Sequence, residues 1–271
     1  MTRGLLQGGG DGAWALGAYC GPAPQRDTLW LHWNFDPVLI LGLLVLAGIH
    51  LMLRVRGAVR GEDIAFAGGW LVLVIAFVSP LCALSVALFS ARAAHHLLMV
   101  ALAAPLIAWA WRARFSALVT GERSALVWLV PTALHIGLFW FWHAPEPYGA
   151  ALQWVPLYWL MQGSLALSAL LFWGLVMAPR PWHGPAEVLA ITTAMSLMGL
   201  LGALLTFAGA PLYAPHLMTT GAFGLTPLED QQLAGLLMWV PGALPYLVAA
   251  IVTGARCLRE RLDAVPKEQA P

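Results

Sequence analysis

The sequence predicts an all-α integral membrane protein, a bundle of seven transmembrane helices with its N-terminus outside and its C-terminus in the cytoplasm. Three observations lead to this prediction. First, 60% of the residues are hydrophobic and 10% are charged, whereas soluble proteins average about 25% charged residues. Second, the apolar residues gather in seven long stretches, and a hydrocarbon core about 30 Å thick needs roughly 20 apolar residues per helix. Third, the segments that connect these stretches differ in charge.

The seven predicted spans follow one another with short connections, which leaves no room for a large soluble domain. They cover residues 37–53, 64–84, 93–111, 125–142, 155–178, 188–208 and 233–254. The chain therefore divides into an extracytoplasmic N-terminal segment (1–36), a seven-helix membrane domain (37–254) and a cytoplasmic tail (255–271).

Polar residues and prolines mark where the individual spans begin, bend and end. His32 and Asp36 precede the first span, Pro80 lies near the end of the second, Arg92 opens the third and His143 follows the fourth. A proline frees backbone groups that a neighbouring helix must then satisfy. The later boundaries are marked by Glu146 after the fourth span, Arg180 after the fifth, His216 after the sixth and Asp230 before the seventh.

The basic residues predict the orientation in the membrane. Alternate connections carry eleven of the fourteen basic residues, and the positive-inside rule places these connections in the cytoplasm. This topology is typical of a multi-pass protein of a bacterial inner membrane. The eleven are Arg54, Arg56, Arg60, Arg112, Arg114, Arg123, Arg180, Arg256, Arg259, Arg261 and Lys267, and the other three are Arg3, Arg26 and Arg92.

The three cysteines do not form a motif. Cys20, Cys82 and Cys257 are far apart, without the CxxC or CxxxC spacing of thiol-based metal shuttles and redox proteins. A disulfide between Cys20 and Cys82 is topologically allowed, because both would lie toward the outer side. The scattered spacing nevertheless favours unpaired cysteines with no part in the chemistry.

The polar residues of the membrane domain gather at the outer side, and two histidines among them suit a metal. His96 and His143 are predicted at the same depth on neighbouring helices, and neutral imidazole binds copper, zinc or iron. Met99 follows His96 by three residues and can face the same groove. Because thioether is a soft ligand, this set favours Cu(I).

The other histidines also have structural interpretations. His95 points about 100° away from His96, which favours packing or headgroup contact, although it completes the candidate metal set. His135 lies eight residues before His143, about 12 Å deeper at 1.5 Å per residue. It belongs to the candidate metal residues only as a second station outside the shell of His96 and His143, or else it is a structural residue that needs a hydrogen-bond partner. His32 and His216 are expected to be solvated loop residues, and His183 is expected to be an interfacial anchor.

A supporting polar cluster is expected from Asp230, Gln231, Arg92 and Asp36. Asp230 lies in the first turn of the last span, where a carboxylate favours the helix dipole and caps N–H groups. Alternatively, Asp230 orients a metal-bound histidine or pairs with Arg92. A salt bridge from Arg92 to Asp230, Glu146 or Asp36 would explain a positive charge on the outer side.

Three ordered segments then give a resemblance to a known family. They are His96-Leu97-Leu98 running to Pro105-Leu106; Trp142-His143-x-Pro145-x-x-Tyr148; and Asp230-Gln231-Gln232-x-x-Gly235-x-x-Met238-Trp239. From about residue 33 to 252 the chain resembles the multi-span CtaG-type cytochrome c oxidase assembly factors. The resemblance implies a non-enzymatic role in respiratory chain biogenesis, with cytochrome c oxidase subunits as partners. Copper handling is our inference from the His and Met residues.

The chain departs from this family's pattern at two places. The family has a histidine four residues before His96, where this chain has Arg92, and a histidine pair early in the fifth span, where it has Tyr158 and Gln162. A histidine-rich metal site carried over from the family would therefore be depleted here.

Several other functions were weighed from the residues. The only lysine, Lys267, lies in the tail, which excludes a retinal protein, and no catalytic nucleophile, phosphate loop or carboxylate dyad points to an enzyme. The composition gives no indication of nucleic-acid binding. The alternative that stays open is a haem- or quinone-linked redox protein, or a small-cation transporter, that uses the same outer His/Asp cluster.

Overall fold

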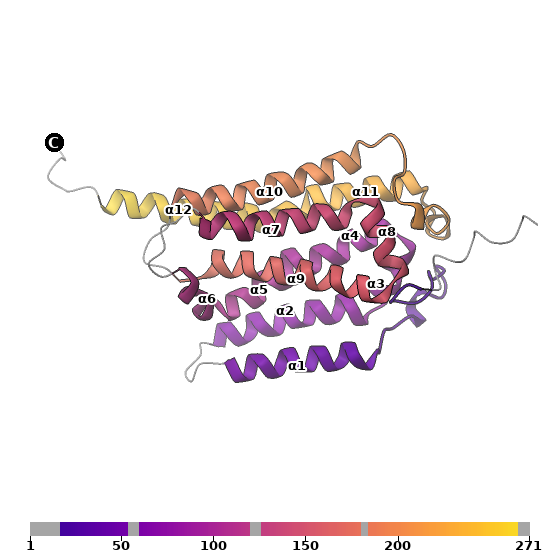
Figure 1. The fold of residues 1–271 in the computed structure, drawn as a ribbon, viewed down its shortest axis with the longest axis horizontal. Coiled ribbons are helices and arrows are strands. Elements are labelled where there is room, and N and C mark those ends of the chain that lie inside the picture. The colour runs from indigo at the N-terminus through magenta and orange to yellow at the C-terminus, as the bar shows by residue number, and fades with distance from the viewer. Residues whose placement is uncertain (1–16, 54–59, 120–125, 180–183, 265–271) are drawn as a thin grey trace, which may run out of the picture.

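The structure is a computed structural model that describes residues 17–53, 60–119, 126–179 and 184–264. Its helices run side by side along one long axis (Figure 1). In chain order they are η1 (Leu29–Leu31), α1 (Pro37–Leu53), α2 (Arg60–Val78), α3 (Leu81–Ala87), α4 (Phe89–Leu97), the π-helix η2 (Leu98–Ala103), α5 (Ala104–Ala110), α6 (Arg112–Val119), α7 (Leu126–His143), α8 (Pro145–Gln153), α9 (Val155–Met177), α10 (Pro185–Thr206), η3 (Ala214–His216), η4 (Thr220–Phe223), α11 (Pro227–Trp239), η5 (Pro241–Ala243) and α12 (Leu244–Asp263).

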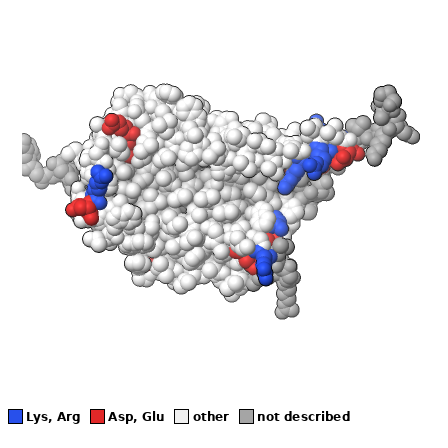
Figure 2. Space-filling model, turned by 180° about the vertical axis from the view of Figure 1, so that it is seen from behind, with Lys and Arg blue, Asp and Glu red and all other residues white. Residues whose placement is uncertain are grey.

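Six stretches of helix in the described residues are long and apolar enough to cross a membrane, which makes the chain an all-helical membrane protein. They are Arg60–Val78, Phe89–Ala110, Leu126–His143, Val155–Met177, Pro185–Thr206 and Pro227–Asp263. The first predicted span coincides with α1, an apolar helix of 17 residues that is shorter than these six. Charged side chains gather at the two ends of the molecule, with a wide uncharged band between them (Figure 2).

The two ends of the bundle differ. Residues 17–36, α3 and α8 lie at one end, and the last turns of α12 lie at the other (Figure 1). We call them the disulfide end, after a Cys20–Cys82 bond located there, and the C-terminal end. The described arginines keep the predicted asymmetry, with Arg26 and Arg92 at the disulfide end and Arg60, Arg112, Arg114, Arg256, Arg259 and Arg261 at the C-terminal end. Predictions on Arg3, Arg54, Arg56, Arg123, Arg180, His183 and Lys267 fall outside the described residues.

Two of the predicted spans are interrupted where the chain would have to bend. The predicted span 64–84 divides at Ser79 and Pro80 into α2 and α3. The Ser79 hydroxyl donates to the Ile75 carbonyl oxygen at 2.5 Å and accepts from the Leu81 N–H at 3.2 Å, so it satisfies backbone groups that the break leaves free. The last span bends between α11 and α12 at Pro241, which has no N–H to continue the helix.

The helix predicted at 233–254 is also longer than expected at both ends. α11 begins at Pro227, because Thr226 and Glu229 form a capping box in which each side chain binds the other's backbone N–H. α12 continues to Asp263, so the first part of the predicted tail is helical.

Two glycines allow α10 and α11 to touch through their backbones. A Cβ atom built on Gly235 would lie 2.5 Å from the Gly202 carbonyl oxygen and 2.6 Å from the Thr206 nitrogen. A Cβ atom on Gly202 would lie 2.8 Å from the Gly235 carbonyl oxygen. Small residues permit such close approach between membrane helices, where van der Waals contact replaces the hydrophobic effect as the driving force. This contact fixes α11, and with it Asp230, against the rest of the bundle.

Candidate functional site

Asp230 positions the helix that carries most of the candidate residues. One carboxylate oxygen accepts from the Phe89 N–H at 2.7 Å, and the other accepts from the Ser90 N–H at 3.1 Å and from the Ser90 hydroxyl. Asp230 is fully buried and thus caps α4, a helix 140 residues earlier in the chain. The prediction that it caps its own helix is wrong, since Thr226 and Glu229 perform that role.

The structure brings His96 and His143 into direct contact. The His96 Nδ1 atom lies 3.3 Å from the His143 Nε2 atom, and both side chains are buried. The His143 Nδ1 atom donates to the Phe139 carbonyl oxygen at 2.7 Å, so it carries the proton and Nε2 keeps its lone pair. We call these two residues the His pair. Its two nitrogen atoms come from α4 and α7.

Gln162 lies beside the His pair on one side, and Met99 lines the same groove as Gln162. The Gln162 Nε2 atom is 3.5 Å from the His96 Nε2 atom. Both Met99 and Gln162 also line an apolar groove of about 350 Å³, whose walls include Leu39, Phe77 and Trp159. Met99 is nevertheless buried, so its thioether lies at the base of this groove.

His95 and His135 lie outside the His pair. The His95 ring packs edge-on against Phe77, with ring centroids 4.6 Å apart, in agreement with the expected packing role. The His135 Nε2 atom lies 2.7 Å from the Tyr246 hydroxyl and its ring stacks on Phe172. The prediction that this deep histidine needs a hydrogen-bond partner is confirmed, and the bond ties α7 to α12.

Arg92 lies at the disulfide end without the salt bridge that the sequence led us to expect. Its guanidinium is fully buried and stands over the Tyr158 ring, 5.3 Å from the centroid. Within the described ranges, none of the three expected acids, Asp230, Glu146 or Asp36, lies within 4 Å of it. Asp230 is turned to the start of α4, and Asp36 is bound at the start of α1. That part of the prediction is wrong.

The segment between α10 and α11 covers the His pair from the disulfide end. The Tyr213 hydroxyl donates to the His143 carbonyl oxygen at 2.6 Å, and the Tyr148 hydroxyl bonds the His216 Nε2 atom at 2.6 Å. Gln231 holds this segment in place, because its Oε1 accepts from the Leu212 N–H at 2.7 Å. Gln231 was expected to support the polar cluster, and in the structure it holds the segment between α10 and α11 in place.

His216 is buried, so the expectation of a solvated loop residue is wrong. The pKa of His216 is lowered to about 3, mainly because burial disfavours the charged imidazole; a backbone hydrogen bond to Ala87 opposes this effect, and the positive charge of Arg92 adds to it. The imidazole is therefore neutral at neutral pH and can accept from the Tyr148 hydroxyl. The contribution of neutral His216 to the free energy of unfolding is fully present above the pKa of an unfolded histidine, about 6.5, and is lost as pH falls toward 3.

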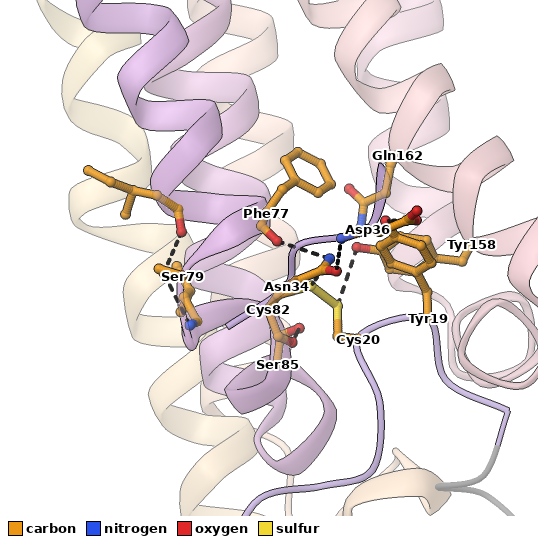
Figure 3. Close-up of a disulfide and its surroundings, with 12 residues drawn as sticks. Tyr19, Cys20, Asn34, Asp36, Phe77, Ser79, Cys82, Ser85, Tyr158 and Gln162 are labelled. Carbon is orange, nitrogen blue, oxygen red and sulfur yellow. Dashed lines mark hydrogen bonds between the residues drawn. A yellow bond between two sulfur atoms is a disulfide. The ribbon is translucent and has the colours of Figure 1, made fainter. Parts of the chain in front are cut away.

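The N-terminal segment covers the neighbouring part of the same end, and a Cys20–Cys82 disulfide ties it to α3 (Figure 3). Tyr19 stacks on Tyr158 with ring centroids 4.9 Å apart, and its hydroxyl donates to Asp36 at 2.6 Å. Burial and the Asp36 carboxylate raise the pKa of Tyr19. The expectation of unpaired cysteines is wrong, because the chain folds back and brings Cys82 to Cys20 across a sequence separation of 62.

Loss of this disulfide is expected to destabilise the fold. Closing a loop of this length contributes about 2–4 kcal/mol in soluble proteins. Cys20→Ser, or reductant added to the wild type, should lower the thermal unfolding midpoint in detergent, and reductant should then have no further effect on Cys20→Ser. Cys257→Ser, which alters the free cysteine, should keep both the wild-type midpoint and its response to reductant. A wild-type midpoint that is insensitive to reductant would contradict the disulfide.

The donor set fits a metal ion that accepts few ligands. The described residues contain no group of three or more His, Cys, Asp or Glu side chains that could hold a metal. A tetrahedral zinc site needs four such ligands, and the described part of the chain does not offer them. Two facing imidazole nitrogens, with Met99 three residues after His96, suit Cu(I) instead.

Comparison with known proteins found one family. The family model described as cytochrome c oxidase caa3 assembly factor (Caa3_CtaG) matches residues 45–260. No curated protein and no solved structure matches the chain. The matched range includes the His pair, Arg92 and Asp230.

Proposed function

Because this chain belongs to the cytochrome c oxidase caa3 assembly factor family, we propose that it supports the biogenesis of such an oxidase by holding Cu(I) at the His pair. The observation that carries this proposal is the contact between His96 Nδ1 and His143 Nε2, fully enclosed by the bundle. The role is non-catalytic: the chain holds and presents the ion, and oxidase subunits are its partners.

We place the chain in a bacterial inner membrane with seven spans, α1 included, and with the disulfide end outside. The clustering of arginines at the C-terminal end supports a cytoplasmic C-terminus. The Cys20–Cys82 disulfide independently supports an outer location of the other end, since disulfides persist in the periplasm and are rare in the cytosol. The His pair would then face the compartment in which copper reaches oxidase subunits.

The hydrogen bond within the His pair determines which proton must move before a cation can bind. In the metal-free pair, the His96 Nδ1–H donates to the lone pair of His143 Nε2. Binding of a cation requires this proton to move to His96 Nε2, which faces Gln162. The Gln162 Oε1 atom accepts no hydrogen bond in the described structure. After a 180° rotation of the Gln162 amide group, this oxygen can accept a hydrogen bond from the proton on His96 Nε2. Gln162 thereby orients the imidazole that binds the ion.

The contact within the His pair also argues against the haem-linked alternative. A haem iron with two axial histidines lies between them, with the porphyrin plane separating the imidazoles. The two rings here touch directly, at a nitrogen separation of 3.3 Å, and leave no room for that plane.

The proposal is tested by copper retention in the detergent-purified protein loaded anaerobically with Cu(I). Wild type should retain about one copper per chain, and His96→Ala and His143→Ala should each lose it. His135→Ala is the matched control, because it removes a buried histidine of α7 that lies outside the pair. In cells, the first two variants should insert normally but lower oxidase copper content and activity.

Two results would overturn the proposal. One is equal copper retention in all four proteins, and the other is normal oxidase copper and activity in both His-pair variants. A Soret band in the purified wild type would instead support the haem-linked alternative.

A further inference from the structure

Arg92 is the one buried arginine of the described residues, and its charge has no counterpart nearby. Its side chain is fully buried, and among the described residues it meets the neutral Tyr148 and Tyr158 hydroxyls but no carboxylate. A buried charge that is neither paired nor solvated is costly, and proteins normally neutralise or pair it. Arginine side chains keep their positive charge in proteins.

The groups around Arg92 are neutral or are donors. It stands over the Tyr158 ring, and its charge partly offsets the rise that burial causes in the pKa of Tyr148, which places the Tyr148 hydroxyl close by. His95, one turn further along α4, also has no partner for either ring nitrogen among the described residues. Phenol and imidazole groups can orient an anion, but they do not cancel a positive charge.

The acids at the same end are already engaged elsewhere. Asp230 binds the first N–H groups of α4. Asp36 accepts from the Tyr19 hydroxyl and from the Val38 N–H. Glu229 closes the capping box of α11 and is exposed to solvent. Glu146 and Asp27 are exposed at the surface, whereas Arg92 is fully buried, and within the part of the chain that the structure describes no carboxylate pairs with Arg92.

We propose that Arg92 binds an anion with carboxylate-like oxygens at its buried position on α4, beside Tyr148 of α8 and Tyr158 of α9. A guanidinium presents its N–H groups as a planar fork that matches two oxygens of a carboxylate or similar oxyanion. A buried positive charge without a counterion selects for such a ligand and against a cation.

The anion site goes beyond copper handling and does not depend on it. Arg92 precedes His96 by four residues on α4, so the two side chains lie on one face of the helix. An anion at Arg92 would reduce the repulsion between the guanidinium and a cation at the His pair. The two sites can nonetheless be tested separately.

The test is a comparison of thermal unfolding in formate and in gluconate at equal ionic strength, with the full-length protein in detergent and its disulfide intact. Formate is small enough to be enclosed, and gluconate serves as the bulky control. The midpoint of the wild type should rise by several degrees and saturate with formate. Arg92→Gln should not respond, and in gluconate it should be at least as stable as the wild type, because it removes the unpaired charge.

Arg26→Gln is the matched control, since it removes an exposed arginine at the same end and should respond to formate as the wild type does. A wild-type midpoint equal in formate and gluconate would overturn the proposal, and so would an equal formate response in Arg92→Gln. If Arg92→Gln does not fold, the midpoints of the wild type in formate and in gluconate still test the proposal. Failure of the anion site leaves copper retention by the His pair unaffected, which separates the two proposals.

A size series distinguishes two sources of the carboxylate. A response limited to formate and acetate indicates a free small anion held in a closed site. A response that extends to succinate but not to the bulkier, polyhydroxylated gluconate indicates a carboxylate presented by a larger partner. Both results support an anion site at Arg92.

Discussion

Replacing Asp230 by alanine is expected to lower the free energy of unfolding by roughly 3–5 kcal/mol and to abolish support of the oxidase. The substitution leaves the buried N–H groups of Phe89 and Ser90 and the Ser90 hydroxyl without their acceptor. Each buried group left unpaired costs about 1–3 kcal/mol. Because α4 carries Arg92 and His96, fraying of its first turn also displaces the candidate site. The measurements are thermal unfolding in detergent and oxidase activity in cells.

Two further variants show whether the cap itself is responsible. Asp230→Asn keeps one carbonyl oxygen as an acceptor and should lose less stability than Asp230→Ala. Glu229→Ala removes the adjacent acid, which is exposed and belongs to the capping box of α11. Because Glu229 is fully exposed and its N–H partner can turn to water, Glu229→Ala should be much milder. Similar losses for Glu229→Ala and Asp230→Ala would refute the role of Asp230 at α4.

Gly235→Ala is expected to destabilise the protein by at least about 3 kcal/mol, at the upper end of the usual cost of overpacking. The added methyl group meets the Gly202 carbonyl oxygen at 2.5 Å and the Thr206 nitrogen at 2.6 Å. These are backbone atoms of a neighbouring helix, so α10 and α11 can accommodate the methyl group only by moving apart. The loss should appear as a lower thermal midpoint and reduced accumulation in the membrane.

Gly163→Ala is the control for this substitution. Gly163 is also in a long helix, α9, but a Cβ atom there has nothing within 4 Å. Alanine has a higher helix propensity than glycine by about 1 kcal/mol, so Gly163→Ala should be neutral or stabilising. Two alanine variants of equal stability would contradict a close backbone contact at Gly235.

The long apolar elements could be predicted from the sequence because membrane spans are defined by length and composition. α9 was predicted at 155–178 and is found at Val155–Met177. The interruptions of the predicted spans were harder to predict from the sequence, because Pro80 could mark either a bend in one helix or a break between two helices. The Ser79 side-chain bonds that stabilise the break are visible only in the structure.

The site was predictable in part. His96 and His143 could be paired because depth in a membrane follows from position in a span, and two histidines at one depth can meet. The role of Asp230 could not be derived, because its partners are 140 residues away and local capping explains the same sequence equally well. The same limit applies to Cys20 and Cys82 and to the contact of His216 with Tyr148. These contacts depend on how the connecting segments fold back over the bundle. The hydrophobic periodicity of the sequence predicts helices but not the path of such segments.

The burial of the His pair has a consequence for the rate at which a ligand is exchanged. His96 is inaccessible to solvent and His143 nearly so. The segment carrying Tyr213 and His216 covers them on one side, and the N-terminal segment, tied down by the disulfide, closes the neighbouring part of the same end. An ion held there can leave only when one of these segments opens, so its residence time is set by the opening and not by the strength of its bonds. A partner that pulls a covering segment away would therefore determine the moment of release.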